Sequence, residues 1–185
     1  MSFFLFESFS SSVHIAATAL TTLCLTAYLA LSNHFVPFLP IEISKLGNYG
    51  TAYWSFSIGT FLTAAQLFFF VVQNYFSSSG WILLHGCVAS FSLMALGSFS
   101  DAGQNFIHRI AAFSFFTNSI AFILHKNGFR HWTVQAMVVS FIIRCVLFPF
   151  EYFAAPKSAE AKFWQQVRAL FQWLTVAFLL WNFVA

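Results

Sequence analysis

The sequence predicts an all-α membrane protein, a polytopic bundle of six transmembrane helices. No Asp, Glu, Lys or Arg occurs in the 55 residues from Leu46 to Ser100. Because a charge in the hydrocarbon core costs several kcal/mol, such a stretch is typical of two spans joined by a polar turn. The whole chain is 59% hydrophobic and 7% charged, whereas about a quarter of the residues of a soluble domain are charged. We therefore expect one transmembrane domain over residues 1–185.

The expected boundaries of the spans follow from the length of the charge-free segments, from aromatic residues at their edges and from turn residues between them. The six expected spans lie near Ser12–Ser32, Thr51–Tyr75, Trp81–Phe99, Phe106–Leu124, Trp132–Phe150 and Phe163–Asn182. The first span ends before Pro37 and Pro40, which remove backbone donors, so the loop at 33–50 is expected to be an ordered re-entrant or capping loop rather than a helix. The Ser-rich turn at 77–80 separates the second span from the third.

The last three spans are separated by polar segments of the same kind. The short link at 100–105 precedes the fourth span, the turn at 125–131 follows it, and the loop at 151–162, with Pro156, separates the fifth span from the sixth. Six spans place both termini on one side of the membrane, here named side A, and the three other connections on side B. Pairs of small residues four positions apart, Ser55 with Gly59 and Gly86 with Ser90, predict close approach of helices.

This topology gathers polar residues at side B. They form a candidate lipid-headgroup site: Asp101, His108, Arg109, Arg144, Glu151 and Arg168. Arg144 lies deepest, six residues before Phe150 and so about 9 Å below the helix end. Asp101 and Glu151 are its expected partners. Two interpretations remain open: a buried site that binds a headgroup or senses protonation, or a structural ion pair that fixes the order of the helices.

Other functional classes find little support in the sequence. Scattered Lys and Arg residues and a net charge of +3 do not predict nucleic-acid binding. The chain has neither an HxxxH nor an HExxH motif, and its three cysteines lie in separate apolar segments, so we expect no metal and no cofactor. A GxSxG elbow, a phosphate-binding loop and a carboxylate pair within a span are also lacking, so we expect no catalytic site and no enzyme.

Residues 37–47, PFLPIEISKLG, resemble the "PFLPYISDTG" signature of the DRAM/FRAG/SFK family of six-span membrane proteins. The residues of this first-loop signature are Pro37, Pro40, Ser44 and Gly47. The family comprises autophagy modulators and relatives that act in lipid and GPI-anchor biology. The resemblance implies the six-span fold, cytosolic termini and an endomembrane or lysosomal location. More of the Lys and Arg residues lie on side B, which would favour the opposite orientation.

Three further segments are similar to the family in the same order along the chain. They are Ile107 with His108 at the start of the fourth span, Arg144 in the fifth, and residues 172–178, QWLTVAF, which resemble the family's "EWTVAF". Two departures stand out: Lys45 occupies a position where the family often has Asp, and Gln172 replaces an acidic residue.

These observations favour a non-catalytic membrane organiser or trafficking and autophagy modulator that acts through membrane lipids and other membrane proteins. An alternative is an accessory structural subunit of a large complex in an organellar inner membrane, since the chain has almost no soluble mass and many Phe-rich faces. A lower alternative is a lipid-remodelling protein that uses the side-B polar residues.

Overall fold

The computed structural model describes residues 2–33, 42–48, 50–77, 80–99, 105–153 and 158–185. Its helices are α1 Ser2–Ser32, α2 Ile43–Leu46, α3 Gly50–Tyr75, α4 Gly80–Ser98, α5 Asn105–Asn127, α6 Trp132–Phe153 and α7 Ala159–Val184. All except α2 contain a segment long and apolar enough to cross a membrane. The predicted all-α fold with six membrane-spanning helices is confirmed.

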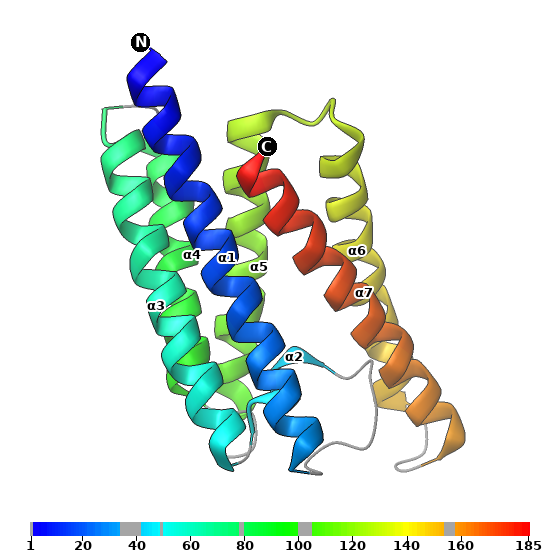
Figure 1. Cartoon of the computed structure of the whole chain (residues 1–185). Helices are drawn as coiled ribbons and strands as arrows, with labels where there is room; N and C mark the ends of the chain where they lie inside the picture. Colours follow the sequence, from blue (N-terminus) through cyan, green and yellow to red (C-terminus); the bar gives the residue numbers. More distant parts are fainter. Residues whose placement is uncertain (1, 34–41, 49, 78–79, 100–104, 154–157) are drawn as a thin grey trace.

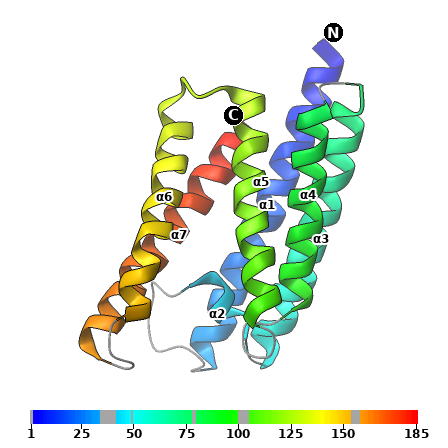
Figure 2. The same ribbon diagram turned by 180° about the vertical axis from the view of Figure 1, so that it is seen from behind.

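The six long helices form two groups. Within the four-helix group, α1 packs on α3, α3 on α4 and α4 on α5, while α6 and α7 pack mainly on each other as a hairpin (Figures 1 and 2). Contacts between the four-helix group and the α6–α7 hairpin are sparser. Both termini lie at one end of the bundle, side A, and α2 lies near the other end, side B, beside α1 (Figure 1).

Helix boundaries differ from the sequence-based expectation at side B. Helix α6 continues to Phe153, so Glu151 belongs to a helix and not to a loop. The aromatic residues around Glu151 extend the apolar character of α6 beyond the charge. The last helix begins earlier than expected, at Ala159, where the Ser158 side chain accepts a hydrogen bond of 3.0 Å from the Ala161 N–H and caps the first turn. Residues Ile43–Leu46 form a helical turn inside the segment expected to be a loop.

Apolar packing joins the two groups toward side A. A buried cluster contains residues from both: Ile15, Phe70, Val71, Ile120, Phe122, Ile123, Val134, Met137 and Phe183. Hydrogen bonds from α5 to α7 reinforce this end, since Lys126 Nζ donates to the Phe183 carbonyl oxygen at 2.8 Å and Asn127 Nδ2 donates to the Asn182 carbonyl oxygen at 2.7 Å. Apolar packing and hydrogen bonds therefore hold the α6–α7 hairpin against the four-helix group at side A.

Small residues bring neighbouring helices close together, as the sequence predicted. A Cβ atom added at Gly59 would overlap the Thr22 side chain of α1, and one added at Gly86 would lie 2.6 Å from the Val71 side chain of α3. Ser55 on α3 shares a hydrogen bond of 3.2 Å with Thr26 on α1. Close approach of this kind supplies much of the packing energy between helices in a membrane.

Replacing Gly59 by Leu is expected to destabilise the protein by about 1–3 kcal/mol, because an added side chain must displace Thr22 and push α1 from α3. The measurement is thermal unfolding of the purified protein in mild detergent. Gly80→Leu is the matched control, since no atom lies within 4 Å of a Cβ added there. Equal transition temperatures for both variants would contradict the close packing of α1 on α3.

Candidate functional site

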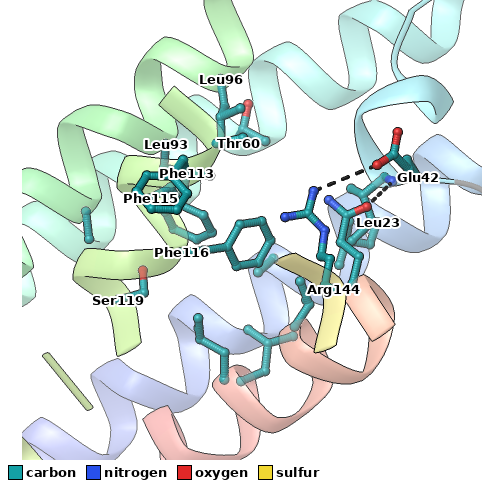
Figure 3. A pocket seen from close by; sticks show the side chains of 18 of the residues that line it. Leu23, Glu42, Thr60, Leu93, Leu96, Phe113, Phe115, Phe116, Ser119 and Arg144 are labelled. Carbon is teal, nitrogen blue, oxygen red and sulfur yellow. Dashed lines mark hydrogen bonds and ion pairs between the residues drawn. The ribbon is translucent and has the colours of Figure 1, made fainter. Parts of the chain in front are cut away.

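A buried carboxylate links three elements at side B. Glu42 directly precedes α2 and is 7% exposed. Arg168 Nη2 on α7 donates a hydrogen bond to Glu42 Oε1 at 2.7 Å, and Arg144 Nη2 on α6 lies 3.8 Å from the same oxygen. Lys45 Nζ lies 3.5 Å from the other oxygen, Oε2. One carboxylate therefore ties the α2 segment to both helices of the hairpin. Figure 3 shows its contact with Arg144.

The α2 segment is held in place by its backbone as well as by Glu42. The Ile43 N–H donates to Gln172 Oε1 at 3.2 Å, one helical turn beyond Arg168 on α7. Leu46 is 1% exposed and packs in a small cluster with Ala30 of α1 and Ala52 of α3, with Trp173 of α7 against it. Docking of α2 thus uses both helix groups.

Gly47 allows the α2 segment to lie directly against α3. A Cβ atom added at Gly47 would come within 2.6–2.8 Å of the Phe56 side chain. A side chain at this position would have to move the Phe56 ring, so glycine permits the close approach. This gives a structural role to one residue of the first-loop signature.

A cavity of about 940 Å³ lies between the four-helix group and the hairpin. Its side-B end is lined by charged and polar side chains: Glu42, Lys45, His108, Arg109, Arg144, Lys162 and Arg168. The remainder is mainly apolar, with lining residues such as Leu93, Leu96, Phe113, Phe116, Phe122, Leu179 and Phe183. Figure 3 shows the phenylalanine side chains of α5 beside Arg144 in this cavity. The cavity is therefore amphipathic along the membrane normal.

Aromatic rings contact both arginines, the buried Arg168 and the half-buried Arg144. The Arg144 guanidinium lies 5.3 Å from the centroid of the Phe116 ring, and that of Arg168 lies 5.2 Å from the Phe148 ring. A guanidinium over an aromatic face is stabilised by the ring quadrupole, and more so away from water. Phe116 thus holds the Arg144 head at the boundary between the charged end and the apolar part of the cavity (Figure 3).

His108 lies in the first turns of α5 and lines the same cavity. It is 3% exposed, and its Nδ1 lies 2.7 Å from the carbonyl oxygen of Phe99. Its Nε2 is buried and has no hydrogen-bond partner among the residues that the structure describes. A buried polar atom of this kind requires an explanation.

The structure brings together four of the residues predicted for the headgroup site. His108, Arg109, Arg144 and Arg168 all line the one cavity. Asp101, Pro37 and Pro40 lie outside the described residues, as do the side chains of Ser44 and Glu151, so the expected contacts of Arg144 with Asp101 and Glu151 stay predictions.

Sequence reasoning missed Glu42 as the partner of Arg144 and Arg168. A signal for it was available, because Glu42 is the one carboxylate between the first two spans and lies among apolar residues. Such a residue needs a cationic partner once the segment docks against the bundle. Lys45 and Lys162, which also line the charged end, were not singled out either.

No family model, curated protein or solved structure matches this chain. Membership of the DRAM/FRAG/SFK family stays a prediction from the motifs. The site is therefore interpreted from its own geometry.

Proposed function

We propose that this protein is a non-catalytic membrane organiser that binds one anionic lipid in the cavity between the four-helix group and the α6–α7 hairpin. The observation that carries the proposal is the amphipathic lining, with charged side chains at side B and apolar side chains elsewhere. Ligand pockets of proteins commonly have volumes of about 300–1,000 Å³, so a cavity of about 940 Å³ has room for a large amphiphile.

Charge favours an anionic headgroup. Five basic side chains, Lys45, Arg109, Arg144, Lys162 and Arg168, line the charged end, whereas Glu42 is the carboxylate found there among the described residues. Arginine and lysine are the side chains that most often bind phosphate, and their charges act more strongly where water is scarce. A lipid phosphate at this end would lie in the side-B half of the cavity.

The length of the cavity favours a lipid over a small soluble anion. Arg168 and Phe183 both line it and are 15 residues apart on α7, which corresponds to roughly 22 Å along the helix. This distance covers most of the ~30 Å hydrocarbon core. Acyl chains would therefore extend from the charged end toward side A along apolar side chains.

The first test is native mass spectrometry of the protein extracted gently from its own membrane, with analysis of the co-purifying lipids. The proposal predicts a monomer or small oligomer that carries about one anionic lipid per chain. Recovery without a lipid would contradict it, and recovery within one large stoichiometric assembly would favour the accessory-subunit alternative.

Filling the cavity is expected to reduce lipid retention. Ala112 on α5 lines the cavity and is half-buried, so Ala112→Phe places a ring in the space proposed for an acyl chain. We expect at least a severalfold smaller lipid-bound fraction in native mass spectra. Ala17→Phe, on an exposed position of α1, is the matched control. A thermal unfolding measurement identifies a variant that loses the lipid because it does not fold, and unchanged retention in folded Ala112→Phe would contradict the proposed position of the lipid.

A further inference from the structure

One hydrogen-bonding atom of His108, Nε2, has no partner within the described part of the chain. Its Nδ1 faces the Phe99 carbonyl oxygen at 2.7 Å. A carbonyl oxygen only accepts hydrogen bonds, so Nδ1 carries the proton, and in the neutral ring Nε2 is an acceptor. His108 is 3% exposed, and none of the residues that the structure describes satisfies this Nε2 acceptor.

The neighbourhood of His108 restricts the donor that can satisfy Nε2. Donors in lipid headgroups are hydroxyl and ammonium groups. Arg109 is adjacent in sequence to His108, and Arg144 lines the same end of the cavity. These cations repel an ammonium group but not a hydroxyl group.

We propose that His108 Nε2 accepts a hydrogen bond from a hydroxyl group of the bound lipid, so that the site selects anionic lipids with a hydroxylated headgroup. The proposal rests on the proposed function, because it assigns a headgroup chemistry to the lipid held in the cavity. The arginines bind the phosphate, and His108 distinguishes lipids of equal charge by their hydroxyl groups. His108 acts here as a binding residue and takes part in no covalent step.

Two lipids of equal charge separate the contribution of the phosphate to binding from that of the headgroup hydroxyl group. Phosphatidylglycerol and phosphatidylmethanol with identical acyl chains have the same charge, but only phosphatidylglycerol has headgroup hydroxyl groups. Both are added in equal amounts to the delipidated protein in mild detergent, and native mass spectrometry measures the two bound fractions. We expect about tenfold preference for phosphatidylglycerol, because the analogue leaves a buried acceptor unsatisfied.

Substitutions assign the preference to His108. His108→Phe keeps a ring of similar size but has no acceptor, and it is expected to bind both lipids equally. His108→Gln places an amide oxygen near the position of Nε2 and is expected to retain part of the preference. His14→Phe, at an exposed position on α1, is the control for the loss of a histidine. Thermal unfolding verifies that each variant is folded, since His108 also contacts the Phe99 carbonyl.

The outcomes separate this inference from the proposed function. Equal binding of the two lipids by the unmodified protein would overturn the role of His108 and leave the lipid site intact. Stronger binding of phosphatidylserine, which has an ammonium group, than of phosphatidylglycerol would overturn the choice of a hydroxyl donor. Binding of none of these lipids would contradict the proposed function itself.

Discussion

Replacing Glu42 by Gln is expected to destabilise the protein by about 3–5 kcal/mol, the usual cost of removing one partner from a buried ion pair. The Glu42 carboxylate accepts a hydrogen bond of 2.7 Å from Arg168 and lies 3.8 Å from Arg144. An amide keeps the shape of the side chain but has no charge, so the attraction to both guanidinium groups is lost. Thermal unfolding in detergent should show a midpoint lower by several degrees.

The control for this prediction is Glu160→Gln. Glu160 is also near side B, but it is exposed and its contact is a hydrogen bond of 3.4 Å from Trp164 Nε1. Surface charges of this kind contribute little to stability. If both variants unfold at the same temperature as the unmodified protein, Glu42 does not fix α2 to the α6–α7 hairpin.

Replacing Arg144 by Leu is expected to leave the protein folded and to weaken binding of the anionic lipid about ten- to a hundredfold. Arg168 makes the shorter contact with Glu42, so the structural link to α7 persists without Arg144. A hydrogen bond to a charged group contributes about 1.5–3 kcal/mol, and 1.4 kcal/mol corresponds to a factor of ten in affinity. Titration of phosphatidylglycerol into the delipidated protein, followed by native mass spectrometry, gives the affinity.

Two further variants make this result interpretable. Arg130→Leu removes the same charge from an exposed position at side A and is expected to bind lipid normally. Arg168→Leu removes the partner that is 2.7 Å from Glu42 and is expected to lower stability in the manner of Glu42→Gln. If Arg144→Leu lowers stability as much as Arg168→Leu does, the result would contradict a binding role for Arg144 and favour the structural ion pair.

The sequence predicted the six spans because bilayer thickness and the cost of charge act on each segment separately. The span at Trp132–Phe150, for example, is bounded by the same length and polarity that define α6 in the membrane. It also predicted that His108, Arg109, Arg144 and Arg168 would lie at one side, since six antiparallel crossings determine the depth of each residue. The positions of the spans and the side on which each polar residue lies can be predicted without knowing which helices pack against one another.

The pairing of Glu42 with Arg168 could not be predicted in this way. It requires the α2 segment to fold back against the bundle. There the Ile43 N–H donates a hydrogen bond to Gln172, and Gly47 packs against Phe56. Depth along the membrane normal does not determine such contacts, because they depend on which helices are neighbours. The orientation of the His108 ring depends likewise on the contact of Nδ1 with the Phe99 carbonyl oxygen, a backbone atom that no side-chain pattern reports.

The contact between Glu42 and Arg168 also has a consequence for biosynthesis. The two residues are 126 positions apart in the sequence, and at ~5–20 residues per second the ribosome adds Arg168 roughly 6–25 s after Glu42. Arg144, the other arginine that contacts Glu42, is added only 24 residues before Arg168. For most of this interval the carboxylate therefore has no arginine partner at this site, and its burial in the bilayer would be costly. We therefore expect the α2 segment to stay solvated at the membrane surface while the later helices are inserted. Its docking is one of the last events in assembly, so the polar end of the cavity closes only when the chain is nearly complete.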